Sequence, residues 1–183
     1  LSGGEQVVSR SGKVCHRSRF PRKLETMIYP EYFPEERAQE HAERKVFDRL
    51  KELSDRYDIF YSKRFVTDGV EKKAEFEVDF IVAIPEKALA CIEVKGGLTQ
   101  YSGTTDSWTQ NGRKLTKRPD GQATAAAHGL VKTFQKHIGK MAVGWALCFP
   151  DCQVAGTSGF PPSIQEAQVI DEQSLLYTDQ ALD

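Results

Sequence analysis

Two apolar segments carry charged residues that can bind a metal ion and activate water. The alternating segment AEFEVDFIVAIP (74–85) holds Asp79, and ALACIEVK (88–95) holds Glu93 and Lys95 on one face. A buried charge is costly unless it is paired or bound to metal. Asp79 and Glu93 could therefore hold one Mg²⁺ ion, and Lys95, roughly 7 Å along the strand from Glu93, could place an attacking water.

An acid followed at a distance by acid-x-Lys is not specific by itself, because a salt bridge on a solvated sheet face gives the same pattern. Three features favour a site. Both segments are apolar on their other face, and Gly96 and Gly97 follow at once, where a substrate backbone could approach. Glu43 also lies on the apolar side of a predicted helix, which is unusual for a carboxylate. A purely structural domain with surface ion pairs remains an alternative.

Hydrophobic spacing predicts the elements that position these residues. A helix is expected from about Pro34, with an apolar stripe made of Val46, Phe47, Leu50 and Leu53. Strands are expected at 57–66, 74–85 and 88–95, and the last two should form a hairpin. Strict alternation in the second strand places five apolar residues on one face, namely Phe76, Val78, Phe80, Val82 and Ile84.

The elements expected in the second half of the sequence complete the pattern of an α/β fold. Residues 96–121 indicate a loop with strand fragments, a helix follows Pro119, and 141–150 is a core strand. The alanine-rich run 123–127 indicates close packing of that helix on the sheet. A short strand and a helix start are expected near VIDEQSLL, so the core order is helix, three strands, helix, strand.

Several polar features admit two interpretations. The basic cluster Arg113, Lys114, Lys117 and Arg118 is either a solvated loop or a grip for phosphates. Trp108 is expected to be a packing residue rather than a base-stacking platform, and His128 and His137 are not expected to be ligands. Four scattered cysteines, Cys15, Cys91, Cys148 and Cys152, lack the partners of a zinc site and are expected to be reduced, as in a cytoplasmic protein.

The chain as a whole is globular in composition, with 183 residues and a net charge of −1. Such a balance argues against a protein that coats nucleic acid but leaves room for a local basic patch. No segment is apolar enough for a membrane span. Residues 1–26 form a basic leader, expected to be disordered or derived from a vector or upstream translation; a nucleic-acid-binding arm is the alternative.

The ordered set of motifs resembles the nuclease-related domain family, a branch of the PD-(D/E)xK nuclease superfamily. AERKVFDRLKEL is similar to the family's opening helix with its glutamate, and EVDFIVAIP and ACIEVKGG are similar to its two motif strands. DSWTQNGRKL and RPDGQATAAAHGL are similar to the stretches that follow. Arg118 stands where the family's pattern has an asparagine. The match covers roughly residues 30 to 150.

This resemblance implies metal-dependent cleavage of nucleic acid, with DNA the expected substrate. Asp79, Glu93 and the backbone carbonyl of Val94 would hold Mg²⁺ or Mn²⁺, and Lys95 would place the attacking water. Glu43 would assist through a water or a second ion. Gln122, at a helix N-terminus, would hydrogen-bond the metal site or a phosphate, unless it is an ordinary first-turn polar residue. Substrate contacts are expected from Gly96, Gly97, Arg113, Lys114, Lys117 and Arg118.

The implied fold is α/β, a restriction-endonuclease-like αβββαβ core with a central mixed sheet flanked by helices. It would occupy residues 27–150, with 151–183 an extension or the start of a linker. Family members are often joined to a helicase or kinase module, so a fused or associated helicase is an expected partner. A catalytically silent module that binds DNA or a protein on the same fold is the main alternative.

Overall fold

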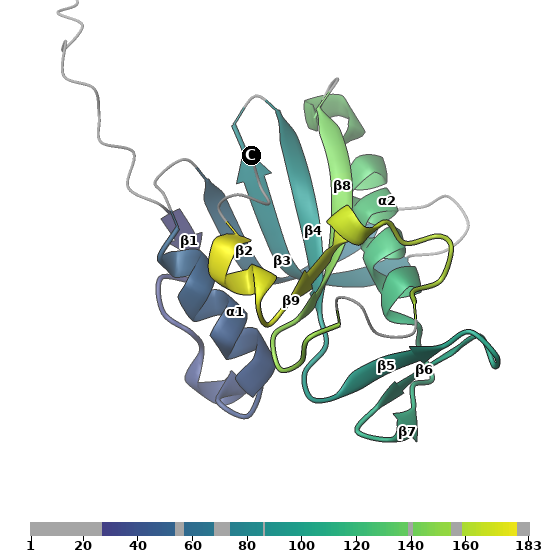
Figure 1. Cartoon of the computed structure of the whole chain (residues 1–183). Coiled ribbons are helices and arrows are strands. Elements are labelled where there is room, and N and C mark those ends of the chain that lie inside the picture. Colours follow the sequence, from purple (N-terminus) through teal and green to yellow (C-terminus); the bar gives the residue numbers. More distant parts are fainter. Residues whose placement is uncertain are drawn as a thin grey trace, which may run out of the picture.

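A six-stranded mixed sheet, with strand order β1-β2-β3-β4-β8-β9, forms the centre of the molecule (Figure 1). The computed structural model describes residues 27–53, 57–67, 74–85, 87–138, 141–154 and 159–178. The prediction for the leader at 1–26 lies outside these residues. No helix in the described part of the chain is long and apolar enough to cross a membrane.

The elements follow one another in this order: β1 (Met27–Tyr29), the 3₁₀ helix η1 (Glu35–Arg37), α1 (His41–Lys51), β2 (Asp58–Thr67), β3 (Ala74–Ile84), β4 (Ala88–Val94), β5 (Thr99–Ser102), β6 (Ser107–Gln110), β7 (Arg113–Lys114), α2 (Pro119–Ile138), β8 (Ala142–Phe149), the 3₁₀ helix η2 (Glu166–Gln168), β9 (Val169–Asp171) and the 3₁₀ helix η3 (Ser174–Tyr177). β2, β3 and β4 are antiparallel, whereas β8 runs parallel to β4. The order α1-β2-β3-β4-α2-β8 confirms the predicted αβββαβ core.

The segment after residue 150 also belongs to this fold in its described part. β9 pairs in parallel with β8, and Leu175 of η3 packs in the same apolar cluster as α1. The guanidinium of Arg49, on α1, donates to the carbonyl oxygens of Leu175 and Leu176. Residues 159–178 therefore extend the sheet and cover one end of α1.

α1 covers one face of the sheet because its apolar stripe has a matching apolar surface there. Val46, Phe47 and Leu50 are buried against residues of β2, β3 and β4. The helix starts later than predicted, at His41, after the short η1. Residues 34–40 are almost entirely polar, so a helix there would bury no apolar stripe, and helices in proteins depend on such burial.

α2 covers the opposite face at close range, as the alanine run predicts. Ala126, Ala127 and Leu130 are buried against the sheet. Gly129 lies so close to Phe76 that an added Cβ would be 2.6 Å from the ring. Small side chains on this helix therefore set the distance between helix and sheet.

The prediction that five apolar residues of β3 share one face is wrong in part. Phe80, Val82 and Ile84 belong to the cluster on the α1 side, whereas Val78 and Phe76 pack on the α2 side. The exchange of faces lies between the pairs Tyr61↔Phe80 and Lys63↔Val78. Ser62 of the neighbouring β2 has a φ of +46° at the same level, so the regular pleat is interrupted in that strand as well. Asp79 lies opposite this break.

A second, three-stranded sheet (β5-β6-β7) follows β4 and packs near the start of α2 (Figure 1). Trp108 of β6 is buried in a cluster with Ala123, Leu147 and Phe149. Its indole Nε1 donates to Asp120 Oδ1 at 3.2 Å. The expectation that Trp108 is a packing residue is confirmed.

Candidate active site

β3 and β4 separate at the residues that the sequence singled out. Their ladder ends at the pair Phe80↔Ile92. The next N–H of β4 available to β3, that of Val94, donates to Asp79 Oδ2 at 2.8 Å. β4 meanwhile stays with β8, since the Lys95 N–H donates to the Cys148 carbonyl at 2.9 Å. The motif residues therefore lie at a fork between two strands.

Asp79 and Glu93 are the first residues beyond the end of this ladder. Asp79 precedes Phe80 on β3, and Glu93 follows Ile92 on β4. Their charges also interact, because the carboxylate of Asp79 helps to raise the pKa of Glu93. The two motif acids thus approach each other as the proposed site requires.

Glu93 is the most deeply buried acid of this group, with 4% of its surface exposed. Lys95 Nζ donates to Glu93 Oε1 at 2.6 Å. Burial, reinforced by the charge of Asp79, raises the pKa of Glu93 to about 7, although Lys95 opposes the rise. Burial also raises the pKa of Asp79, and the Val94 N–H opposes that rise. Both carboxylates are therefore placed where an added cation would stabilise their charged forms.

Glu43 approaches the same fork from α1. Burial, with the charge of Asp79 adding to it, raises its pKa to about 7, while the hydrogen bond from Tyr61 acts in the opposite direction. The Tyr61 hydroxyl lies 2.5 Å from Glu43 Oε2 and 2.9 Å from Glu40 Oε2. A phenol has one proton to donate, so the two carboxylates share it or one of them is itself protonated.

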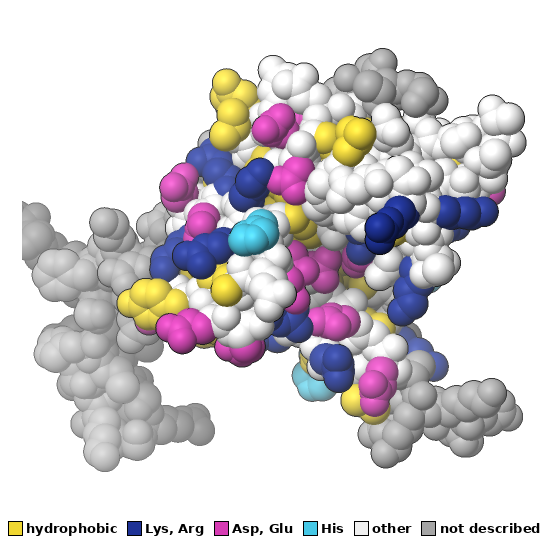
Figure 2. All heavy atoms as spheres, turned by 90° about the horizontal axis from the view of Figure 1, so that it is seen from below, with side chains coloured by type: hydrophobic (Ala, Val, Ile, Leu, Met, Phe, Trp, Pro, Cys, Tyr) yellow, Lys and Arg dark blue, Asp and Glu magenta, His cyan; other side chains and the backbone are white. Residues whose placement is uncertain are grey.

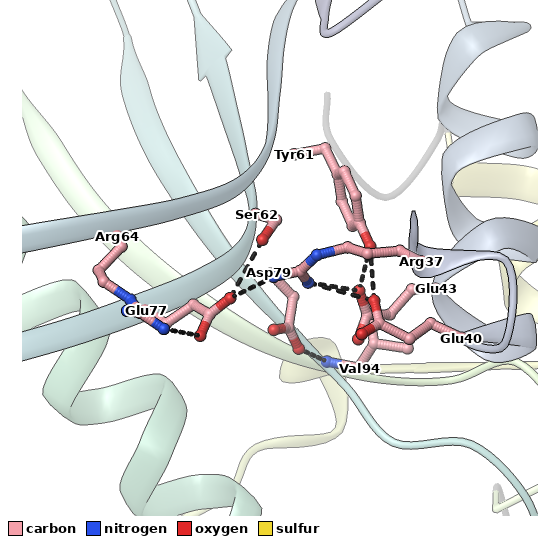
Figure 3. A network of polar contacts seen from close by, with 9 residues as sticks. All are labelled: Arg37, Glu40, Glu43, Tyr61, Ser62, Arg64, Glu77, Asp79 and Val94. Atoms are coloured by element: carbon pink, nitrogen blue, oxygen red, sulfur yellow. Dashed lines mark hydrogen bonds and ion pairs between the residues drawn. The ribbon is translucent and has the colours of Figure 1, made fainter. Parts of the chain in front are cut away.

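Arg37, on η1, joins these helix acids to β3 (Figure 3). Its Nη1 lies 3.1 Å from Glu40 Oε2 and 3.7 Å from Glu43 Oε2, and its Nη2 lies 3.1 Å from Glu77 Oε1. The guanidinium is also 5.6 Å from the centre of the Tyr61 ring. The side chain therefore lies between Glu40 and Glu43, at the start of α1, and Glu77 of β3.

A cavity of about 530 Å³ opens beside the fork, between the start of α1 and the β5-β6-β7 sheet. Figure 2 shows this side of the molecule, with acidic side chains inside the hollow and Lys and Arg side chains around it. Seven of the predicted site residues line the cavity: Glu43, Val94, Lys95, Gly96, Gly97, Lys117 and Gln122. Asp79 and Glu93 lie behind this lining, since each bonds directly to a lining residue, Val94 or Lys95.

The two glycines are required by the protein itself rather than only by a substrate. A Cβ on Gly96 would lie 2.6 Å from Ala42 Cβ, so glycine allows α1 to approach the end of β4. Gly97 has a φ of +66°, and its Cβ would lie 2.5 Å from the Asn111 side chain. The interpretation of this pair as a substrate approach remains a prediction, because both also line the cavity.

The four predicted basic residues occupy different environments. Lys117 is exposed at the cavity, and Arg113 and Lys114 are exposed on β7. Arg118 is engaged within the protein, at 2.8 Å from Asp106 Oδ1 and 3.0 Å from Asp120 Oδ2. Arg118 thus connects the start of α2 to the turn before β6.

Sequence reasoning missed Asp151, which also lines the cavity. Its Oδ2 accepts the Gly97 N–H at 2.7 Å, and its Oδ1 forms an ion pair with Lys45 of α1. Burial would raise its pKa, but these two partners lower it overall. The signal was its position directly after a core strand, because residues that follow the parallel strands β4 and β8 meet at one edge of the sheet.

Arg37, Glu40, Tyr61 and Glu77 were also missed. Arg37 and Glu40 lie in the polar run before α1, and Tyr61 and Glu77 lie in strands whose patterns do not distinguish them from ordinary core and surface residues. Their convergence depends on the contact between η1 and β3, which has no local signal in the sequence.

The donor set suits a hard divalent ion that keeps some of its water. Among the described residues, no three His, Cys, Asp or Glu side chains are grouped as ligands of one ion. One buried carboxylate (Glu93) and one partly buried carboxylate (Asp79), both with raised pKa values, are present, and Mg²⁺ typically binds to one or two carboxylates plus water and substrate oxygens. The residues at the fork therefore fit such an ion.

Comparison with known proteins gives one result. The family model described as "NERD: Nuclease-related domain" matches residues 38–150, which is more than half of the chain. The matched region begins before α1 and ends after β8, so it contains Glu43, both motif strands and Gln122. The chain shows no significant match to a curated protein or to a solved structure.

Proposed function

The chain belongs to the nuclease-related domain family, and we propose that it is a metal-dependent nuclease that hydrolyses phosphodiester bonds in DNA. One observation carries this proposal. Asp79 and Glu93 lie directly beyond the last pair of the β3–β4 ladder and interact electrostatically, and Lys95, bonded to Glu93, lines the cavity. An ordinary surface salt bridge would not be placed at a strand fork beside a hollow of this size.

A divalent cation, Mg²⁺ or Mn²⁺, would be held by the carboxylates of Asp79 and Glu93 and by the backbone carbonyl of Val94. When bound, such an ion supplies positive charge that polarises a phosphate oxygen and favours deprotonation of water. The raised pKa values of both carboxyl groups support this role, because a bound cation would stabilise the ionised forms that burial disfavours.

The remaining polar residues of the site would act on the water and on the phosphate. Lys95 Nζ would orient the attacking water and offset negative charge that develops on the phosphate. Glu43, with a pKa raised to about 7, can take up a proton at its carboxylate near neutral pH. Gln122 lies in the first turn of α2 and at the cavity, where its amide could donate to a phosphate oxygen.

The cavity rim would bind the nucleic-acid backbone. Lys117 is the basic residue best placed for this, since it is exposed and lines the cavity. Arg113 and Lys114 on the exposed β7 would extend the contact, whereas Arg118 contributes less because Asp106 and Asp120 already occupy its guanidinium. A fused or associated helicase is the partner we propose, on the basis of the family alone.

Cleavage assays test this proposal. Labelled single-stranded, double-stranded and branched DNA would be incubated with the native chain and Mn²⁺ or Mg²⁺. We expect Asp79→Ala and Lys95→Ala to reduce the cleavage rate on the order of 10²-fold or more. Asp48→Ala and Lys132→Ala change the same residue types at exposed positions of α1 and α2 and should leave the rate unchanged. Equal cleavage rates in the native chain and all four variants would show that the proposed site is wrong.

A catalytically silent binding module is the second candidate. It is favoured by the Lys95–Glu93 ion pair of 2.6 Å, which already neutralises one of the two motif acids. In that case DNA would bind with the same affinity in the presence of Mn²⁺ and of a chelator. Any Mn²⁺ binding seen by calorimetry would then be the same in the native chain and in Asp79→Asn. No DNA would be cut.

A further inference from the structure

We propose that Arg37 acts as a built-in cation that joins Glu40 and Glu43, at the start of α1, to Glu77 of β3 and limits the candidate site to a single divalent ion. This inference deepens the proposed function and rests on it for the identity of the first ion. It concerns Glu40 and Glu43, at the start of α1, rather than Asp79 and Glu93 at the end of the β3–β4 ladder.

The guanidinium of Arg37 contacts carboxylates from two elements at once. On the helix side, Nη1 lies 3.1 Å from Glu40 Oε2 and 3.7 Å from Glu43 Oε2. On the strand side, Nη2 donates to Glu77 Oε1 at 3.1 Å. Figure 3 shows the guanidinium between these two groups of acids. A planar fork with five N–H donors is suited to such a bridge, whereas a single ammonium is not.

The surroundings hold the guanidinium in this place. Tyr61 lies beside it, with its ring centre 5.6 Å from the guanidinium carbon. Glu77, the strand-side partner, is itself fixed by the Ser62 hydroxyl at 3.0 Å. The side chain of Arg37 is 29% exposed, so its interactions are only partly screened by water. Burial would raise the pKa of Glu40, but hydrogen bonding, above all from Tyr61, and the charge of Arg37 together lower it, and the same charge opposes the rise in the pKa of Asp79.

These contacts leave little room for a second metal ion next to Glu43. The Oε2 atoms of Glu40 and Glu43 both face the guanidinium and the Tyr61 hydroxyl, so one oxygen of each carboxylate is already occupied. Arginine does not lose its proton in proteins, so its charge would repel the ion until the side chain moved away. Glu43 therefore binds water or a proton instead of a second metal ion, and Arg37 acts as a positioning residue for it.

Calorimetric titration with Mn²⁺ tests the proposal. The native chain should bind one ion, and Asp79→Asn should abolish that binding. Arg37→Gln should bind a second, weaker ion, because the acids of α1 and β3 are left without their shared cation. The second ion should disappear in the double variant Arg37→Gln, Glu43→Gln. Arg44→Gln is the matched control, since it removes a 54% exposed arginine of α1 and should leave one ion per chain.

Arg37→Lys provides a second test should Arg37→Gln fail to fold. Its shorter side chain carries one ammonium that cannot reach both groups of acids, so a second ion should again bind, more weakly than in Arg37→Gln. If Arg37→Lys and any folded Arg37→Gln bind one ion with native affinity, the inference is wrong. Should the native chain bind no Mn²⁺ and cut no DNA, the proposed function fails. A gain of one ion on removal of Arg37 would still support the role of the guanidinium.

Discussion

Glu43 is expected to destabilise the metal-free protein at alkaline pH, and Glu43→Gln should remove this effect. Its carboxyl group is held half-buried on α1, and burial raises its pKa from 4.5 to about 7. A group whose pKa is higher in the folded state than in the unfolded state binds more protons when folded. Its contribution to stability is therefore full below pH 4.5 and is lost as the pH rises through about 7.

The expected size follows from the same shift. A rise from 4.5 to about 7 corresponds to about 3 kcal/mol of unfolding free energy between the two ends of this pH range. The glutamine variant keeps an oxygen that can accept the Tyr61 hydroxyl hydrogen bond but carries no charge. We therefore expect Glu43→Gln to be more stable than the native chain by about 2–3 kcal/mol at pH 8.5, and by much less at pH 4.5.

Urea unfolding at several pH values, with a chelator present to remove divalent ions, measures this difference. Glu52→Gln makes the same chemical change at a side chain that is 71% exposed, next to the end of α1, and should show no such trend. Only the difference between variant and native chain is used, so the titration of Glu93 and Asp79 largely cancels. A stability difference for Glu43→Gln that stays constant from pH 4.5 to 8.5, or that grows as the pH falls, would refute the reasoning.

The remaining predictions concern the contacts that hold α1 to the end of β4. Gly96→Ala should lower the free energy of unfolding by about 1–3 kcal/mol, because its Cβ would lie 2.6 Å from that of Ala42. Adding Ala42→Gly should recover part of this loss in urea unfolding, and additive losses in the double variant would contradict the reasoning. Asp151→Ala should lower the free energy of unfolding by about 1–3 kcal/mol, since the Gly97 N–H and Lys45 both lose their partner. Exchange of the Gly97 amide hydrogen should accelerate, and an unchanged exchange rate would show that the hydrogen bond is dispensable.

Much of the fold and part of the site could be predicted because their signals are local. Alternation in the two motif strands fixes the hairpin, and its length places Asp79 near Glu93. Cys91 packs toward α2 while Ile92 and Val94 pack toward α1, as the alternation of β4 predicts. The apolar stripe of α1 likewise has its expected partners, and the cysteines within the described residues are free.

The parts that could not be predicted depend on contacts between distant segments. Asp151 reaches Gly97 only because β8 lies beside β4, and the pairing of these strands is not encoded near either residue. Arg37 reaches Glu77 only because η1 lies over β3. Both residues bear charges in polar stretches, where a local pattern cannot distinguish an exposed charge from one that bridges two elements.

The break at Ser62 shows how an unpredicted local feature makes the predicted site workable. Under strict alternation Asp79 would share the face of Ile81, which packs against α2 in an apolar cluster. A carboxylate there would be buried without partners, at a large cost. Because the faces exchange at this position, Asp79 instead reaches the end of the β3–β4 ladder and accepts the Val94 N–H. The same feature that interrupts the hydrophobic pattern thus accompanies a carboxylate that binds the backbone of Val94, a residue that lines the cavity.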